Sequence, residues 1–539
     1  MAKYWYKNAV IYSLHVQTFM DGNADGVGDF QGLTRSLDYL AGLGITCLWL
    51  QPFFPTPNRD NGYDISDYLN VDPRYGTLGH FVEFLDAAEE RGIRVIIDLV
   101  LNHTSVEHPW FQKARKDRSS PYRKYYIWLD EKPENPDEDV IFPGHQGDNW
   151  EYDDVAGQYY YHTFYPHQAD LNIANPDVRR EIQYILHFWL RLGIAGFRMD
   201  AVPHMVKEKG NEKFQEDPFL FLESIRSFVE EQRKDSILLA EVDTEPDEYK
   251  QFFGNGNRVH MLLNFYLTNH IFLALARNEA EPIVTGLNNL PQTSVREQMG
   301  IFLRNHDELD LERLSDAERE EVYAAFAPDK SMRIYQRGIR RRLAPMLKNN
   351  RQMMELAWSL LFTLPGTPVI LYGDELGMGE NLGLEERNSV RTTMQWSNEN
   401  HGGFSAAQDI VPPCIRDSEY GFEKVNVHGQ LRDPLSFLNW VERLINIRKE
   451  CIEFGYGHYE MIKCNHPGVL IQASHYKNGI ALAIHNLTDE AVIVKPEKLY
   501  ENMIEYFSDG EYDDQQLESG EIKLKPYGYR WFRKSPLLL

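Results

Sequence analysis

The sequence is poor in cysteine and in positive charge, and it has no long hydrophobic run. Only four of the 539 residues are cysteine, and their spacing fits neither a CxxC metal or redox pair nor a disulfide framework. No stretch of about 18 apolar residues occurs, so we expect no membrane-spanning helix. The first residues also lack an apolar signal segment, and we therefore expect a cytoplasmic protein.

The charge balance is strongly acidic. Lysine and arginine number 56 against 81 aspartate and glutamate residues, which gives a net charge of −25. Such a field repels nucleic acid backbones and anionic lipid surfaces, so we expect neither as a partner. A neutral substrate meets no such repulsion. With 42% hydrophobic residues the chain can build a large buried core, and a homo-oligomer remains open.

Eight short apolar runs alternate with longer amphipathic stretches. Segments 33–44, 79–92, 178–193 and 218–232 place apolar residues at i, i+3, i+4 and i+7, which predicts helices packed on one face. A strand and a helix repeated eight times indicate the α/β class, as a (β/α)8 TIM barrel. The predicted strands lie in the runs 10–16, 46–53, 94–100, 193–201, 236–242, 260–265, 299–306 and 367–375.

Two long interruptions and a tail divide the chain. We assign residues 1–102 and 176–450 to the barrel. Residues 103–175 are too long for an ordinary βα loop and predict a small inserted domain after the third strand. A second insertion, 308–350, follows the seventh strand, and we expect it near the active site. Residues 452–539 contain short strand-like runs separated by turns, which predict a C-terminal β-sandwich domain.

Polar residues recur where the predicted strands end. Because barrel enzymes carry their function on the loops at the carboxyl ends of the strands, these side chains should converge on one mouth. Glycoside cleavage needs one ionised carboxylate and one protonated carboxyl. Taken singly, each acid could instead cap a helix or form a solvated ion pair. The residues concerned are Tyr63-Asp64, Asp98, Asn102-His103, Arg198, Asp200, Glu241 and His306-Asp307.

Four segments in this order resemble the signature segments of the α-amylase superfamily of retaining glycoside hydrolases and transglucosylases. They are DLVLNH (98–103), GFRMDA (196–201), LLAEV (238–242) and FLRNHD (302–307). The resemblance covers residues 5–450. It implies Asp200 as nucleophile, Glu241 as general acid/base and Asp307 as transition-state stabiliser. It also implies that the substrate is bound by Tyr63, Asp64, His103, Phe142, Phe164, Gln168, Arg198, His306 and Arg391.

The loop DGNADGVGD (21–29) has the spacing of a calcium loop. A tight turn could aim the side chains of Asp21, Asn23, Asp25 and Asp29, together with the Val27 carbonyl, at one structural Ca²⁺, which Mg²⁺ could replace. The alternative is an Asx-rich turn without metal. Many superfamily members carry a similar loop, which favours the metal. We expect no organic cofactor.

Relatives have a second metal site, which uses the equivalents of Asn102 and Asp170 and a glutamate from the loop after the fourth strand. In this chain Lys207 stands where that glutamate is expected, and only a shift of one residue would bring Glu208 into its place. A lysine would repel a cation, so we expect this second site to hold no metal.

Within the superfamily the closest resemblance is to the trehalose synthases, which interconvert maltose and trehalose. It rests on segments 305–329, 332–347, 372–382 and 390–397. The expected substrates are therefore small neutral saccharides: maltose, trehalose and glucose. The chain departs from the pattern after the acid/base, where trehalose synthases read Ala-Asn-Gln-Trp and this chain reads Val242-Asp243-Thr244-Glu245. Hydrolysis of α-glucosides, transfer to another acceptor and a catalytically silent sugar-binding protein remain alternatives.

Overall fold

Eight parallel strands close into a barrel in the computed structural model, which describes residues 4–136, 140–144, 146–210, 212–416, 418–512 and 520–534. Each barrel strand overlaps one predicted run, and the fold class is confirmed. Nearly every strand residue is buried, because side chains fill the interior and helices cover the outside. In their spatial order the strands are β1 (Ile11–Leu14), β16 (Thr367–Leu371), β12 (Gln298–Ile301), β11 (Met261–Leu263), β10 (Ile237–Ala240), β9 (Gly196–Met199), β3 (Arg94–Leu99) and β2 (Cys47–Leu50).

The four predicted helices are present, and their ends follow from local sequence. The helix α6 (Pro176–Leu192) begins after Asn175, whose side chain accepts a hydrogen bond from the Asp177 N–H, and it ends at Gly193 in the left-handed region. The predicted helix 33–44 is divided at Ser36, whose hydroxyl donates to the Gly32 carbonyl. The larger helices around the barrel are α2 (Phe30–Arg35), α3 (Leu37–Leu43), α4 (Leu78–Glu90), α8 (Phe219–Gln232), α10 (Phe265–Arg277), α11 (Glu281–Asn289), α14 (Arg351–Thr363) and α16 (Phe437–Glu450).

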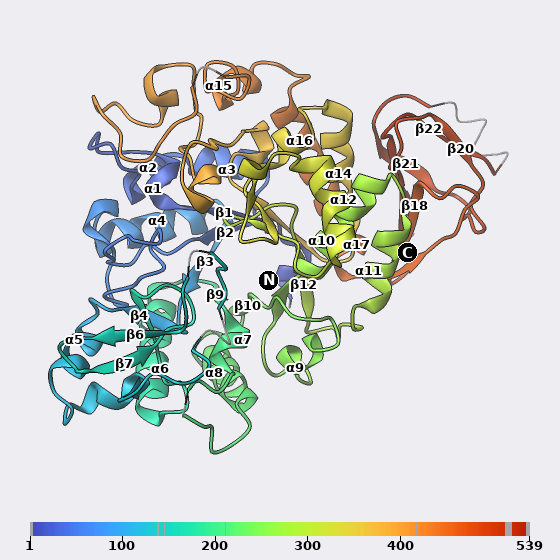
Figure 1. Cartoon of the computed structure of the whole chain (residues 1–539). Coiled ribbons are helices and arrows are strands. Elements are labelled where there is room, and N and C mark those ends of the chain that lie inside the picture. The colour runs from blue at the N-terminus through green and yellow to red at the C-terminus, as the bar shows by residue number, and fades with distance from the viewer. Residues whose placement is uncertain are drawn as a thin grey trace.

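Residues 103–175 form a separate small β structure beside the barrel mouth, at the lower left of Figure 1. Strands β4 (His103–Ser105) and β8 (Gln168–Asp170) pair antiparallel, with His103 opposite Asp170. This pairing connects the inserted segment to the end of β3. The rest comprises α5 (Pro109–Lys116) and a three-stranded sheet of β5 (Trp128–Leu129), β7 (Gln158–Tyr161) and β6 (Trp150–Asp153).

The second insertion is a small sheet followed by a return to the barrel. The sheet has the spatial order β13 (Leu309–Asp310), β15 (Gly338–Ile339) and β14 (Arg333–Ile334). In the sequence α12 (Asp316–Phe326) lies between β13 and β14, and α13 (Leu343–Met346) follows β15. Tyr335 lies between β14 and β15, and its ring packs 4.7 Å from that of Phe142 in the inserted domain. The two insertions therefore contact each other over the barrel mouth.

The C-terminal segment has two antiparallel sheets that share a hydrophobic core, at the right of Figure 1. One sheet has the order β17 (His458–Met461), β18 (Val469–Tyr476), β19 (Gly479–Asn486), β23 (Tyr529–Lys534) and β21 (Ile504–Ser508). The other pairs β20 (Val492–Val494) with β22 (Ile522–Leu524). The short helices that complete the chain are α1 (Val16–Phe19), α7 (Val202–Met205), α9 (Tyr249–Phe253), α15 (Val427–Leu431) and α17 (Glu453–Tyr456).

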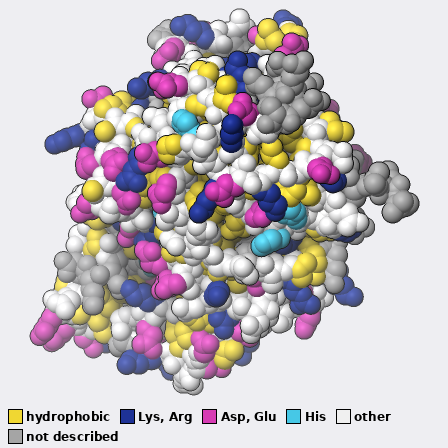
Figure 2. Space-filling view, turned by 90° about the vertical axis from the view of Figure 1, so that its right-hand side faces the viewer, with side chains coloured by type: hydrophobic (Ala, Val, Ile, Leu, Met, Phe, Trp, Pro, Cys, Tyr) yellow, Lys and Arg dark blue, Asp and Glu magenta, His cyan; other side chains and the backbone are white. Residues whose placement is uncertain are grey.

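Acidic and basic side chains are interspersed on the face that Figure 2 shows. This mixture leaves no broad basic surface in that view, in keeping with the acidic composition. Among the described residues no helix is both long enough and apolar enough to span a membrane.

Candidate active site

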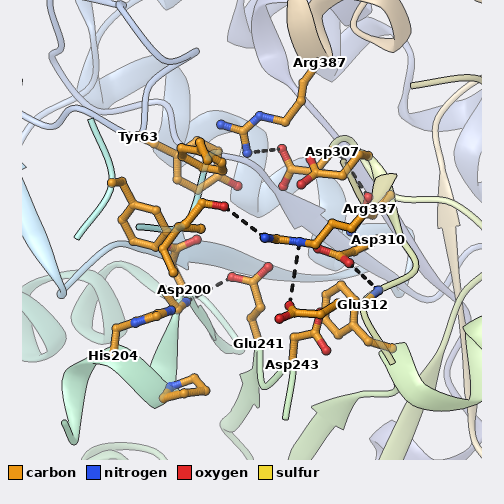
Figure 3. Close-up of a pocket in the computed structure, with 18 of the residues that line it drawn as sticks. Tyr63, Asp200, His204, Glu241, Asp243, Asp307, Asp310, Glu312, Arg337 and Arg387 are labelled. Carbon is orange, nitrogen blue, oxygen red and sulfur yellow. Dashed lines mark hydrogen bonds and ion pairs between the residues drawn. The ribbon is translucent and has the colours of Figure 1, made fainter. Parts of the chain in front are cut away.

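A cavity of about 360 Å³ opens at the carboxyl ends of the barrel strands. It receives side chains from the segments after β2, β9, β10, β12 and β16 and from both insertions, and Figure 3 shows the central ones around one space. Four predicted residues do not line it: Asp64, Arg198, His306 and Arg391. The predicted residues that do line it are Tyr63, His103, Phe142, Phe164, Gln168, Asp200, Glu241 and Asp307.

One buried guanidinium connects the first two catalytic candidates. Arg198, which is 1% exposed, places Nη1 2.6 Å from Asp200 Oδ1 and Nη2 2.7 Å from Glu241 Oε2. Nη1 also lies 2.8 Å from Oδ1 of the fully buried Asp98. A single guanidinium can contact both carboxylates only if they are close, as the separation of about 5–5.5 Å in retaining glycosidases requires. Arg198 thus lies behind the cavity wall and positions its two acids.

Burial tunes these two acids differently. It raises the pKa of Asp200 to about 6, although the charge of Arg198 opposes the shift. Burial raises the pKa of Glu241 to about 7; Arg198 lowers it, and the nearby charges of Asp200 and Asp307 raise it further. Near neutral pH Asp200 is then mostly ionised, while Glu241 exchanges its proton readily. A nucleophile and a general acid/base need these two states.

The third candidate, Asp307, is surrounded by cations. Arg387 Nη1 lies 2.8 Å and Arg391 Nη2 2.6 Å from its Oδ1. Burial would raise the pKa of Asp307, but the neighbouring His306 ring and the positive charges of Arg387 and Arg391 hold it below the usual range. Burial also lowers the pKa of His306 well below its usual value, so the permanent charges here are those of the two arginines. Asp307 therefore stays ionised and can accept hydrogen bonds from sugar hydroxyls.

In the loop after β2, the aspartate that lines the cavity is not the one that we predicted. Asp64 is fully buried, and its carboxylate accepts hydrogen bonds from the backbone N–H groups of Arg59 and Asp60 and from the Thr56 hydroxyl. Asp64 therefore shapes the loop and does not line the cavity. Asp60 lines the cavity instead. Its Oδ1 lies 3.2 Å from Arg387 Nη2, and its Oδ2 lies 3.0 Å from Gln168 Nε2.

The two other predicted residues outside the cavity support residues that line it. His306 stacks its ring parallel to that of Tyr63, with Nε2 2.6 Å from the Tyr63 hydroxyl. Arg391 donates to Asp307, as described above. Sequence reasoning missed Arg387 as well as Asp60, although Arg387 lies only four residues before Arg391. The segments that we expected near the site, 242–245 and 308–350, also supply lining residues that we did not name as site residues: Asp243, Thr244, Glu308, Asp310, Glu312, Arg313 and Arg337.

The contacts between the two insertions cover the cavity. Arg337 donates to the Ile141 carbonyl across them. The hydroxyls of Tyr165 and Tyr335 lie 2.7 and 3.0 Å from the same Glu386 carboxylate oxygen. Aromatic packing and these hydrogen bonds join the two insertions beside the cavity.

The loop 21–29 is folded as a series of Asx turns. The side-chain oxygens of Asp21, Asn23 and Asp25 each accept a hydrogen bond from the N–H two residues later. Asp29 accepts from the N–H groups of Gly22 and Asn23. Calcium-binding loops use oxygen-rich turns of this kind. Among the described residues, however, Asp21, Asp25 and Asp29 do not form a group whose carboxylate oxygens all lie within 4.8 Å of one another.

A lysine ammonium lies between Asn102 and Asp170, the two residues of the second metal site that we expected to be empty. Nζ of Lys209 lies 2.7 Å from Asp170 Oδ2 and 2.6 Å from Asn102 Oδ1. Lys209 is 6% exposed and Asp170 is fully buried. We expected a lysine to repel a metal ion at this position, but we assigned that role to Lys207. The structure shows that Lys209, two residues later, supplies the positive charge.

The fold, the signature segments and the three carboxylates define the class. The chain belongs to the alpha-amylase family, because residues 13–457 match its catalytic domain. It is 44% identical over 473 residues to the trehalose synthase/amylase TreS of Mycolicibacterium smegmatis, with 86% of this chain and 80% of that protein covered. It is 43% identical to the trehalose synthase of Pimelobacter sp. over 86% of this chain and 83% of that protein.

Solved structures agree with this assignment. The trehalulose synthase MutB from Pseudomonas mesoacidophila MX-45 superposes with a TM-score of 0.78 at 25% identity, over 99% of this chain and all of that one. An alpha-amylase from H. orenii gives a TM-score of 0.78 at 27% identity, over 98% of this chain and all of that one. The predicted membership of the α-amylase superfamily is confirmed.

Proposed function

We propose that the protein is a retaining glucosyl-transferring enzyme that interconverts maltose and trehalose, with some hydrolysis as a side reaction. One observation carries the chemistry: Arg198 bridges Asp200 and Glu241 beside the ionised Asp307 in a single covered cavity. The similarity to trehalose synthases over most of the chain supports the choice of reaction. A mutant of the fold neighbour MutB has been solved in complex with sucrose, which supports a small neutral saccharide as substrate.

The reaction has two displacements. Asp200 attacks the anomeric carbon of the non-reducing glucose, and Glu241 donates its proton to the leaving oxygen. Asp307 accepts hydrogen bonds from ring hydroxyls and Tyr63 packs against the sugar. The released glucose then reorients and presents its anomeric hydroxyl, from which Glu241 removes the proton. Attack on the covalent intermediate gives the α,α-1,1 linkage.

The contacts over the cavity mouth determine how much product is lost to water. Isomerisation requires that the free glucose turns while the covalent intermediate is shielded. The hydrogen bonds of Tyr165 and Tyr335 to Glu386 hold the two insertions together at this point. Water that enters gives hydrolysis, which is the competing α-glucosidase activity. Asp200, Glu241 and Asp307 all line the cavity, which argues against a catalytically silent binder.

Incubation with maltose tests the proposal. We expect trehalose to exceed free glucose in the early product mixture, and the nucleophile variant Asp200→Ala to lose turnover while its circular dichroism spectrum is unchanged. Glucose as the sole product would assign the protein to hydrolysis. Undiminished turnover by Asp200→Ala would refute the role of Asp200.

A structural Ca²⁺ in the loop 21–29 is part of the proposal. Asp21, Asn23, Asp25 and Asp29, with the Val27 carbonyl, would hold it, and Mg²⁺ could replace it. The ion would brace the loop after β1 and would take no part in the reaction. We expect chelation to lower the melting temperature and added Ca²⁺ to restore it. An unchanged melting temperature, together with no metal by elemental analysis, would contradict the site.

A further inference from the structure

A second cavity, of about 810 Å³, lies at the opposite end of the barrel from the active site. Its lining includes Lys7, which precedes β1, Gln298, the first residue of β12, and Gly366, directly before β16. The remaining walls are the segment after α11, the helix α17 and the turn between β18 and β19. The cavity is thus bounded by the amino ends of barrel strands and by the C-terminal domain. Small-molecule sites occur preferentially at such domain boundaries.

Lys7 brings a positive charge into this cavity that the protein leaves without an ion pair among the described residues. Lys7 is 7% exposed, and its Nζ donates one long hydrogen bond, of 3.4 Å, to the Ser294 carbonyl. Glu297 attracts this ammonium, but its carboxylate accepts the Ser294 N–H at 2.7 Å and does not line the cavity. Burial lowers the pKa of Lys7 to about 8. A buried charge with so little compensation is costly, and native structures seldom keep one without a reason.

The charge of the lining favours an anion. No aspartate or glutamate occurs among the described residues that line the cavity, although the chain has 81 acidic residues. The lining does contain a second lysine, Lys477, in the turn between β18 and β19, and the histidine His458. A cation would meet no compensating carboxylate here. An anion would meet two ammonium groups, one from the barrel and one from the C-terminal domain.

Tyrosine rings line the same cavity, and hydrogen bonds hold two of them in place. The hydroxyl of Tyr456 donates to the Tyr4 carbonyl at 3.1 Å, and that of Tyr459 donates to the Leu287 carbonyl at 3.2 Å. The ring of Tyr476 lies 5.3 Å from that of Tyr456. Aromatic rings offer flat apolar surface against which another ring can pack. The cavity therefore suits a ligand that has both an anionic group and an uncharged ring.

We propose that this cavity binds a phosphate monoester of a cyclic alcohol, either a sugar phosphate or a nucleoside monophosphate. The phosphate would lie at Lys7 and Lys477, and the ring would pack against Tyr456 and Tyr476. A phosphate monoester carries roughly −1.5 to −2 charges at neutral pH, which two ammonium groups balance, and its oxygens accept their hydrogen bonds. The site does not depend on the reaction proposed for the active site. A bound ester would connect the barrel to the C-terminal domain, because each of them supplies one lysine.

Isothermal titration calorimetry on the full chain tests the proposal, with glucose 6-phosphate and AMP as probes and with glucose and inorganic phosphate as comparators. We expect both esters to bind more tightly than either comparator. Lys7→Met and Lys477→Met should each weaken ester binding about tenfold, the effect of one charged hydrogen bond. Tyr476→Leu should weaken it about threefold and leave inorganic phosphate unaffected. Lys477 is exposed, so its variant tests the site without disturbing the core.

Proton uptake gives a readout that a merely structural lysine would not produce. At pH 8 Lys7 is about half protonated in the free protein, and a bound phosphate would favour its charged form. Binding should then take up about half a proton, measured as a dependence of the heat on the ionisation enthalpy of the buffer. Lys7→Met should abolish this uptake. Without ligand, Lys7→Met should melt no lower than the unmodified protein, because the ammonium has no ion pair to lose.

Lys449→Met is the matched control. Nζ of Lys449 also donates one hydrogen bond of 3.4 Å to a backbone carbonyl, that of Gly44, but Lys449 does not line the cavity. Its variant should bind both esters as the unmodified protein does. Tighter binding of glucose 6-phosphate would identify a sugar phosphate as the ligand, and tighter binding of AMP a nucleotide. Ester binding that neither Lys7→Met nor Lys477→Met weakens would place the ligand elsewhere and overturn the proposal. So would the absence of binding at about 10 mM of either ester.

Discussion

The buried ion pair of Lys209 and Asp170 allows a quantitative test of how the inserted domain is fixed to the barrel. Replacing Lys209 by methionine keeps the apolar part of the side chain but removes the charge 2.7 Å from Asp170 Oδ2. Asp170 would keep three hydrogen bonds, from Asn102 Nδ2 and from the backbone and hydroxyl of Thr163. It would nevertheless be an uncompensated charge in a fully buried position. Breaking such a pair from one side costs about 3–5 kcal/mol.

The double variant distinguishes charge from packing. Asp170→Asn alone should also destabilise, because it leaves a buried ammonium unpaired. Combining Lys209→Met with Asp170→Asn removes both charges, and we expect it to recover about half of the loss. The control is Lys213→Met, which changes an exposed lysine of the same loop and should have little effect.

Native-state hydrogen exchange is the appropriate assay, because a chain with several domains need not unfold in one step. Hydrogen exchange at the amides of β4 and β8 reports the free energy of local opening. This free energy should fall by about 3–5 kcal/mol in Lys209→Met, and by about half as much in the double variant. Since His103 pairs with Asp170 in this ladder and lines the cavity, KM should rise as well. A loss below about 1 kcal/mol, or a double variant no more stable than Lys209→Met, would refute the reasoning.

Two further predictions concern the catalytic groups. The value of kcat/KM should fall as the pH drops below about 6, where Asp200 becomes protonated, and as it rises above about 7, where Glu241 loses its proton; a rate that stays flat from pH 5 to 9 would contradict these assignments. Arg387→Met should lower kcat/KM roughly a hundredfold, because one guanidinium holds both Asp60 and Asp307. Steady-state kinetics measure this loss, and a change below about threefold would show that Arg391 alone holds Asp307.

The barrel and its catalytic acids could be predicted from local sequence. A strand buried on both faces is a nearly continuous apolar run, and such runs mark the eight strands, with few polar interruptions such as Ser13, Asp98 and Arg198. Asp200, Glu241 and Asp307 each follow one of these strands closely. Parallel strands in a closed barrel all end at the same mouth, so their convergence follows from topology and does not depend on side-chain detail.

The path of a loop decided which of two nearby aspartates faces the cavity. Asp60 and Asp64 lie on one short segment, and we chose Asp64 by resemblance although Asp60 lines the cavity. The backbone between them takes positive φ angles at Asn61 and Gly62, and this turn directs Asp60 into the cavity and Asp64 into the loop. Lys207 and Lys209 present the same difficulty: only the folded loop shows which ammonium reaches Asp170.

The sequence by itself determined the elements and the acids at their ends, because burial and periodicity act over a few neighbouring residues. The tertiary structure alone decided the partners: Arg387 with Asp60, Lys209 with Asp170 and Arg313 with Asp243. Each of these pairs joins residues distant along the chain, between 39 and 327 positions apart by their numbers. Charge attraction depends on distance in space, and that distance exists only once the loops have packed.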